Sequence, residues 1–218
     1  MSSDSRRVVT RRLLLSGAMA AGALTLFPGP ARAAPGAWIA DCAMWGARRE
    51  SAPPAVLATR PRSIVIHHTA TANVADVTRE RAFTLARSIQ RHHMVERGWS
   101  DTGQHFTVSR GGFVVEGRHG SLAALRSGTS MVRGAHCTGH NDTSLGIETE
   151  GTYTGAAPPA AQYRALVELC ARICHGYGLP PSAVHGHRDF NATQCPGDAL
   201  HALLPRLRED VAAALSRR

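Results

Sequence analysis

The sequence contains no lysine, so its 25 basic residues are all arginine. A guanidinium stays protonated at ordinary pH, and no fixed cation of this chain can therefore act as a general base. Aromatic residues make up only 5% of the chain, and no basic run is interleaved with aromatic side chains. This composition argues against nucleic-acid binding.

The apolar stretch near the N-terminus, Leu13–Phe27, is too short to span a bilayer comfortably. The pair Arg11-Arg12 precedes it, and Ala31-Arg32-Ala33 resembles a signal-peptidase site. We expect residues 1–33 to be a cleaved export signal of the twin-arginine type. An ordinary Sec signal with two extra arginines is the alternative, and either one takes the protein out of the cytoplasm.

Cleavage leaves 185 residues, enough for one domain with a proper core. Removing five arginines and one aspartate lowers the formal net charge from +9 to +5. A basic exported protein is attracted to anionic polymers, which outside a bacterium are those of the cell wall or the membrane surface. We expect a secreted, periplasmic or wall-associated monomer that is not inserted in a membrane after cleavage.

Five cysteines occur in a chain whose expected compartment permits oxidation. If Cys195 binds a metal, four cysteines remain, an even number that could form disulfides. The sequence does not show which of these four would pair. Buried free thiols are the alternative. The four are Cys42, Cys137, Cys170 and Cys174.

The first expected elements follow an irregular lead, residues 34–61. Residues 62–68 have the composition of a buried strand. Residues 76–97 place apolar side chains near the 3.6-residue period of an amphipathic helix. Residues 104–109 and 113–116 alternate on either side of Arg-Gly-Gly, which predicts a hairpin.

Strand and helix patterns continue to alternate toward the C-terminus. Residues 143–151 show the alternation of a half-buried strand. Residues 160–177 predict a second helix that ends at Gly178, and residues 198–215 predict a third. We expect an α/β domain over residues 62–218.

Histidine and cysteine side chains provide candidate metal ligands. His67 and His68 end the first expected strand and point to opposite faces, so only one of them can serve a given site. His185 and His187 lie two apart and could share a face. Two imidazoles and the thiolate of Cys195 would leave open the fourth position of a catalytic zinc. Spacing alone leaves two candidate ligand sets. Both contain His187 and Cys195, and the third ligand is either His67 or His185.

Four sequence segments occur in a fixed order: Val-Ile-His-His-Thr from Val65, Ser-Leu-Gly-Ile-Glu from Ser144, Gly-His-Arg-Asp from Gly186, and Cys-Pro-Gly from Cys195. Together they resemble the peptidoglycan recognition protein and type 2 N-acetylmuramoyl-L-alanine amidase family, over about residues 38–212. The resemblance implies a central mixed β-sheet flanked by helices, in an exported bacterial protein.

The resemblance also implies a ligand set. One zinc ion per chain would be bound by His67, His187 and Cys195. His185 would then have a supporting role, and His68 would pack against or orient its neighbours.

The catalytic base implied by the resemblance differs between two branches of the family. One branch has a tyrosine where this chain has Gln104, whose amide does not titrate. The other has a glutamate in a Gly-Ile-Glu context, here Glu148, which can accept a proton from water beside a divalent cation. Glu150, two residues on, could influence its ionisation. Solvent-facing glutamates on an edge strand are the alternative.

Further roles follow from family positions. Thr193 stands two before the third ligand, where its hydroxyl could assist an oxyanion. His136 and Asn141 resemble groove residues that contact muramyl peptide, and Gln104 could position the substrate. Arg118 could pair with a stem-peptide carboxylate. Plain surface or scaffold roles remain open for His136, Asn141 and Arg118.

The implied function is zinc-dependent hydrolysis of the amide between the lactyl group of N-acetylmuramic acid and L-alanine of the peptidoglycan stem peptide. The partners would be peptidoglycan and muropeptides. A recognition protein without activity is one alternative. Another uses Cys195 as a nucleophile activated by His187, which leaves His67 without a role.

Overall fold

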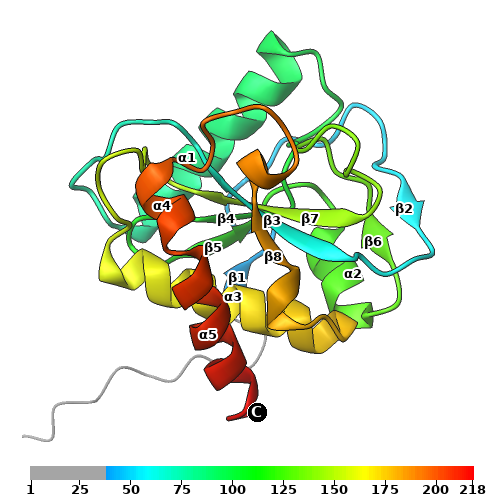
Figure 1. Ribbon diagram of the computed structural model, residues 1–218. Coiled ribbons are helices and arrows are strands. Elements are labelled where there is room, and N and C mark those ends of the chain that lie inside the picture. Colours follow the sequence, from blue (N-terminus) through cyan, green and yellow to red (C-terminus); the bar gives the residue numbers. More distant parts are fainter. Residues whose placement is uncertain (1–37) are drawn as a thin grey trace, which may run out of the picture. The chain divides into compact units, whose positions relative to one another are not determined.

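The computed structural model describes residues 38–218, so the expected signal at residues 1–33 lies outside the described residues. Figure 1 shows a six-stranded sheet in the order β1-β5-β4-β7-β3-β8, with neighbouring strands parallel except β4 and β5. A short antiparallel pair, β2 with β6, lies apart from it. The strands are β1 (Ile39–Ala40), β2 (Val56–Leu57), β3 (Ser63–His68), β4 (Phe106–Val108), β5 (Val114–Glu116), β6 (Met131–Val132), β7 (Ser144–Thr149) and β8 (Val184–Gly186).

Helices cover both faces of the six-stranded sheet (Figure 1). Helices α3 and α5 pack on each other and, with α2, bury the larger core against one face. Helix α1 closes a smaller core with β1 and β5 on the other. The helices are α1 (Arg79–Arg91), α2 (Ser121–Ser127), α3 (Ala160–Tyr177), α4 (Asp198–Ala202) and α5 (Leu204–Leu215), with a π-helical turn η1 (His92–Glu96) and 3-10 turns η2 (Pro181–Ala183) and η3 (His187–Asp189). The expected α/β fold with a mixed sheet is confirmed.

Local sequence explains where the two long helices begin and end. The Thr78 hydroxyl accepts a hydrogen bond from the Arg81 backbone N–H and caps α1. The buried face of this helix is apolar and includes Ala82, Leu85 and Ala86. Helix α3 ends at Gly178, whose φ of 72° suits a residue without a side chain.

Two expectations about elements were wrong. The lead at residues 34–61 is not wholly irregular, because β1 and β2 fall within it. The expected helix at residues 198–215 is two helices that meet at Leu203. Pro205 lacks a backbone N–H and its ring conflicts with a preceding helical carbonyl, so α4 cannot continue through it.

Strand β7 is central in the sheet, between β4 and β3, and is more buried than its alternating pattern suggested. Its apolar face packs on the core, while its small and acidic residues face the opposite side of the sheet. Glu148 is therefore not on an edge strand. The register of β3 and β7 pairs His67 with Glu148 near the carboxyl ends of both strands, the usual place for a ligand site in such sheets.

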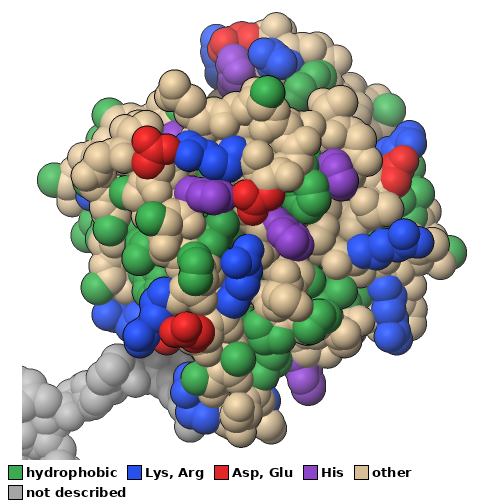
Figure 2. Space-filling model, in the orientation of Figure 1, with side chains coloured by type: hydrophobic (Ala, Val, Ile, Leu, Met, Phe, Trp, Pro, Cys, Tyr) green, Lys and Arg blue, Asp and Glu red, His purple; other side chains and the backbone are tan. Residues whose placement is uncertain are grey.

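All five cysteines are free thiols, and four of them are buried. The disulfide pairing considered from the sequence therefore does not occur. No helix within residues 38–218 is both long and apolar enough to cross a membrane. Figure 2 shows basic side chains scattered over the visible face rather than gathered in one patch.

Candidate metal centre and active site

Three candidate ligands meet at the carboxyl ends of the strands. His67 lies near the end of β3, His187 opens the turn after β8, and Cys195 follows on the next loop. One ligand atom from each lies within 4.8 Å of the others. His185 is not in this group, and its ring packs on Phe190 with 5.1 Å between centroids. The structure thus brings His67 rather than His185 to the cluster.

In both His67 and His187, the ring nitrogen Nε2 lies within hydrogen-bonding distance of a neighbouring side chain. His67 Nε2 lies 3.0 Å from Nδ1 of His136. His187 Nε2 lies 3.1 Å from Oδ1 of Asn191. His67 Nδ1 faces the cluster, 3.7 Å from Cys195 Sγ. The Cys195 sulfur also accepts the backbone N–H of His68, at 3.4 Å, so His68 contributes to the site through its backbone.

The electrostatics of the cluster suit a divalent cation. Burial lowers the pKa of both His67 and His187, so the imidazoles are neutral with lone pairs free for a metal. Burial, followed by the nearby charge of Glu148, raises the pKa of the Cys195 thiol to about 12. A cation bound by the three candidate ligands would stabilise the Cys195 thiolate and offset its repulsion by the negative charge of Glu148. The donor set fits zinc, with three protein ligands and an open position.

Glu148 lies beside the ligands and has no partner of its own. Its Oε2 is buried and accepts no hydrogen bond from the described residues. Burial raises the pKa of Glu148 to about 8. A buried carboxylate next to a site for a cation and water is suited to proton transfer.

A cavity of about 370 Å³ joins these groups. Glu148, Gln104 and His136 line it together with the three ligands. Thr193 is exposed at its rim, and its hydroxyl accepts the Cys195 backbone N–H at 3.2 Å. The sequence-predicted ligands, base and oxyanion residue are therefore brought together in one place.

A family model described as N-acetylmuramoyl-L-alanine amidase matches residues 57–198. The chain belongs to this amidase family. The human N-acetylmuramoyl-L-alanine amidase is 35% identical over 162 residues, which are 73% of this chain and 26% of the human protein. Peptidoglycan recognition protein 1 of Bos indicus is 34% identical over 144 residues, 66% of this chain and 70% of that protein. The chain thus spans about a quarter of the human relative.

The fold agrees with this family. The solved structure of peptidoglycan recognition protein LE, in complex with tracheal cytotoxin, superposes with a TM-score of 0.67 at 28% identity. The match covers 78% of this chain and 93% of that one. The resemblance to peptidoglycan recognition proteins and type 2 amidases is confirmed.

Gln104 lines the cavity as a buried amide. Its Nε2 donates to the Thr107 hydroxyl at 3.0 Å, while its buried Oε1 has no partner among the described residues. Thr107 pairs with Glu148 across β4 and β7. Oε1 of Gln104 thus keeps an unused acceptor position in the lining of the cavity.

Two other residues expected in the groove have scaffold contacts. Asn141 Oδ1 accepts the backbone N–H groups of His136 and Cys137, at 2.8 and 3.0 Å. Arg118 is buried, and its Nε and Nη1 donate to the carbonyls of Thr102 and Arg133, each at 2.7 Å. Burial lowers the pKa of this guanidinium. Neither side chain lines the cavity that holds the ligands.

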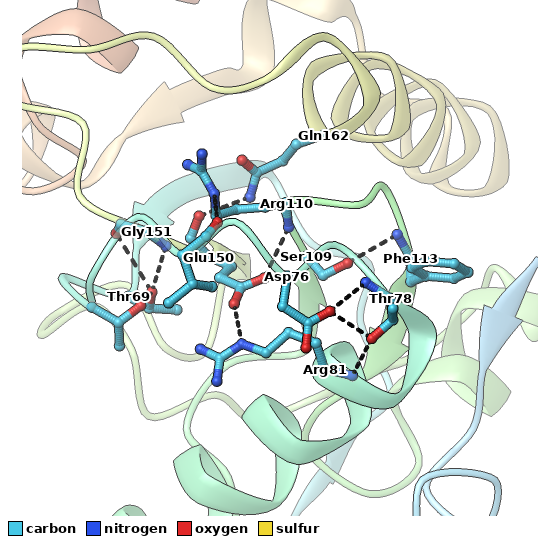
Figure 3. Close-up of polar contacts among 12 residues, drawn as sticks. Thr69, Asp76, Thr78, Arg81, Ser109, Arg110, Phe113, Glu150, Gly151 and Gln162 are labelled. Atoms are coloured by element: carbon cyan, nitrogen blue, oxygen red, sulfur yellow. Dashed lines mark hydrogen bonds and ion pairs between the residues drawn. The ribbon is translucent and has the colours of Figure 1, made fainter.

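Glu150 does not act on Glu148. Figure 3 shows its carboxylate between Arg81, whose Nε donates at 2.8 Å, and the backbone N–H of Arg110, at 2.9 Å. The Glu150 side chain is fully buried in this ion pair. It ties α1 and the loop after β4 to the end of β7.

Sequence reasoning missed three side chains near the candidate site. Asn191 contacts His187, and the spacing of four residues between them was a signal that the sequence contained. His93 and Trp99 stack with 4.6 Å between ring centroids and line the cavity. Only the fold shows that the turn η1 and the residues after it bring His93 and Trp99 there.

Proposed function

We propose that this chain is a zinc-dependent N-acetylmuramoyl-L-alanine amidase. It hydrolyses the amide between the lactyl group of N-acetylmuramic acid and L-alanine of the stem peptide. The observation that carries the proposal is the unpartnered Glu148 carboxylate, paired in register with His67 beside the three ligand side chains. The ligand of the LE structure, tracheal cytotoxin, is a monomeric diaminopimelic acid-type peptidoglycan, and this supports peptidoglycan fragments as substrates.

His67, His187 and Cys195 would hold the zinc. When bound, zinc supplies Lewis-acid chemistry, polarising the scissile carbonyl and making water more acidic. Glu148 accepts a proton from the water that attacks the carbonyl carbon. Burial raises the pKa of Glu148 to about 8, which makes its carboxylate a stronger base, and no hydrogen bond from the described residues competes for Oε2. A zinc ion bound nearby would favour the ionised form of Glu148 that accepts the proton.

The carbon–nitrogen bond then breaks, and Glu148 returns its proton to the departing L-alanine nitrogen. Thr193 stabilises the oxyanion, because its oxygen already accepts the Cys195 N–H and its own proton is free to point at the substrate. Gln104 Oε1 accepts an N–H of the substrate. Arg118 lies behind the cavity wall, and its hydrogen bonds to the Thr102 and Arg133 carbonyls give it a supporting role there rather than the expected contact with a stem-peptide carboxylate.

The same groups favour catalysis over binding alone. A recognition module needs neither an intact ligand set nor an unpartnered carboxylate oxygen in the same cavity, and this chain has both. The structure also disfavours Cys195 as a nucleophile, since burial raises the pKa of its thiol to about 12. Export directed by the expected signal at residues 1–33 would bring the enzyme to peptidoglycan outside the cytoplasm.

The proposal is tested by digesting purified peptidoglycan and following the release of new L-alanine amino termini. Wild type should release them, and Glu148→Gln should lower the rate by roughly 10²- to 10⁴-fold while keeping its zinc. If wild type releases none, the enzyme proposal fails. Full activity in Glu148→Gln refutes the base.

The ligand set is tested separately by zinc content. His67→Ala should lose zinc, whereas His185→Ala should keep it. A chelator should abolish activity and added zinc should restore it. Activity that survives chelation would support the cysteine nucleophile instead.

A further inference from the structure

Four histidine rings form a continuous row from the interior of the protein to the metal centre. In order they are His105, His136, His67 and His187, with centroid separations of 5.4, 5.1 and 4.4 Å. His105 is fully buried and His67 almost so. Between His136 and His67 the contact is a hydrogen bond between ring nitrogens, so the proton position on one of these two rings constrains that on the other.

The backbone fixes the tautomer of His136. Its Nε2 faces the carbonyl oxygen of Ser144 at 3.3 Å, and a carbonyl can only accept. Nε2 therefore carries the proton, and Nδ1 is an acceptor. His67 Nε2, 3.0 Å from that Nδ1, must then donate. The consequence is that His67 Nδ1 has a free lone pair directed at the metal centre.

A second, separate set of contacts fixes His187. Asn191 Nδ2 donates to the carbonyls of Thr138 and Phe190, at 3.2 and 3.1 Å, which settles the orientation of its amide. Its Oδ1 must then accept from His187 Nε2 at 3.1 Å, as it also does from the Cys137 thiol at 3.2 Å. His187 Nδ1 is left free for the metal.

We propose that His136 and Asn191 are positioning residues that hold both ligand histidines in the Nε2–H tautomer before the metal arrives. This inference rests on the proposed metal site and deepens it. It also assigns His136 a role other than substrate binding, since both of its ring nitrogens are used within the protein.

The surroundings of His136 make this arrangement rigid. Asn141 Oδ1 holds its backbone N–H at 2.8 Å. The ring lies against the backbone of Gly146, where an added Cβ would come within 2.5 Å of Cγ. Because these contacts hold His136 in place, its Nδ1 acceptor has one fixed position. Less rearrangement of the ligand histidine is then needed when the metal binds.

The first test needs neither metal nor substrate. Imidazole ¹⁵N NMR of the metal-free wild type should show protons on Nε2 of His67, His136 and His187 and none on Nδ1. In His136→Leu, which removes the acceptor, His67 should instead average between tautomers. A proton on Nδ1 of His67 in the wild type overturns the proposal.

The second test measures zinc dissociation constants by competition with a chromophoric chelator. His136→Leu and Asn191→Leu should each weaken zinc binding by about 10- to 100-fold. His136→Asn, whose amide oxygen can replace Nδ1 as the acceptor, and Asn191→Asp, which keeps an oxygen acceptor, should recover most of that loss. Equal constants in all five proteins, with unchanged circular dichroism, would contradict the inference.

Failure of this inference and failure of the proposed function can be told apart. If wild type binds zinc but does not cleave peptidoglycan, the amidase proposal fails while the tautomers can still be as stated. If wild type cleaves and its histidines average between tautomers, only the inference fails. Should His136→Leu not fold, the wild-type spectrum and the Asn191 variants decide.

Discussion

The absence of a side chain at Gly146 leaves room for the His136 ring beside the metal centre. Gly146 lies in β7 beneath the His136 ring, and a Cβ there would lie 2.5 Å from Cγ and 2.7 Å from Nδ1. Real Cβ contacts are longer, so the ring would have to move. The nitrogen that faces His67 would move with it.

We therefore expect Gly146→Ala to weaken zinc binding and to lower the free energy of unfolding by about 1–3 kcal/mol, the usual cost of overpacking. Zinc competition and urea denaturation measure the two effects. Gly155→Ala is the matched control, because a Cβ there meets nothing within 4 Å. Equal zinc affinity in Gly146→Ala and wild type would show that the ring position does not matter.

At the residue scale, the sequence predicted the atoms that do chemistry better than those that orient them. His67, His187, Cys195 and Glu148 stand in recognisable segments whose residue types reveal their chemistry. Asn191 contacts His187 within one local turn, but the orientation of its amide depends partly on the Thr138 carbonyl, which only the tertiary structure brings near.

At the scale of elements, the buried pair of Arg81 and Glu150 joins α1 to the end of β7. The Glu150 side chain has no exposure, whereas that of Arg81 is 25% exposed. Removing the arginine leaves a buried carboxylate whose remaining donor is the Arg110 backbone N–H (Figure 3). An uncompensated buried charge is far costlier than a lost surface pair.

Arg81→Met should therefore lower the free energy of unfolding by about 2–3 kcal/mol, somewhat less than for a fully enclosed pair. Urea denaturation measures the change. Arg206→Met is the control, since Arg206 pairs with Asp210 on the surface at 67% exposure and should cost under about 0.5 kcal/mol. Similar losses in the two variants would mean that Glu150 is not the anchor of α1.

Elements with clear periodicity were predictable, and very short ones were not. The pattern at residues 160–177 gave both ends of α3, and alternation around Arg-Gly-Gly gave the β4–β5 hairpin. Strands β1 and β2 have two residues each, too few to show a period. Their pairing partners lie far away in sequence, so only tertiary contacts define them.

At the scale of the whole molecule, alternation could not say whether β7 was central or at an edge. A polar face can turn toward solvent or toward an internal site, and both give the same sequence pattern. Here the polar face lies against the row of histidines. The molecule consequently encloses several imidazoles in their neutral form, which links its stability to pH.

His105 is the clearest case. Its Nε2 donates to the Val132 carbonyl at 2.7 Å, and its Nδ1 accepts the Gly146 N–H at 2.9 Å, so both nitrogens are used in the neutral form. Burial lowers the pKa of His105 to about 4. Burial also lowers the pKa of His93 to about 4. In the unfolded chain each would titrate near 6.5.

Between about pH 6.5 and 4 the unfolded chain therefore binds protons that the folded protein excludes, so stability falls as pH falls through this range. Above about pH 6.5 His105 is neutral in both states and does not lower the free energy of unfolding. By pH 4, protonation of His105 in the unfolded chain lowers the free energy of unfolding by about 3 kcal/mol. Urea denaturation of the metal-free protein at several pH values measures this slope. His105→Gln lacks the titrating ring, so its slope should be shallower than that of wild type by up to about 1.4 kcal/mol per pH unit. Parallel slopes would mean that His105 accepts its proton in the folded protein as readily as in the unfolded chain.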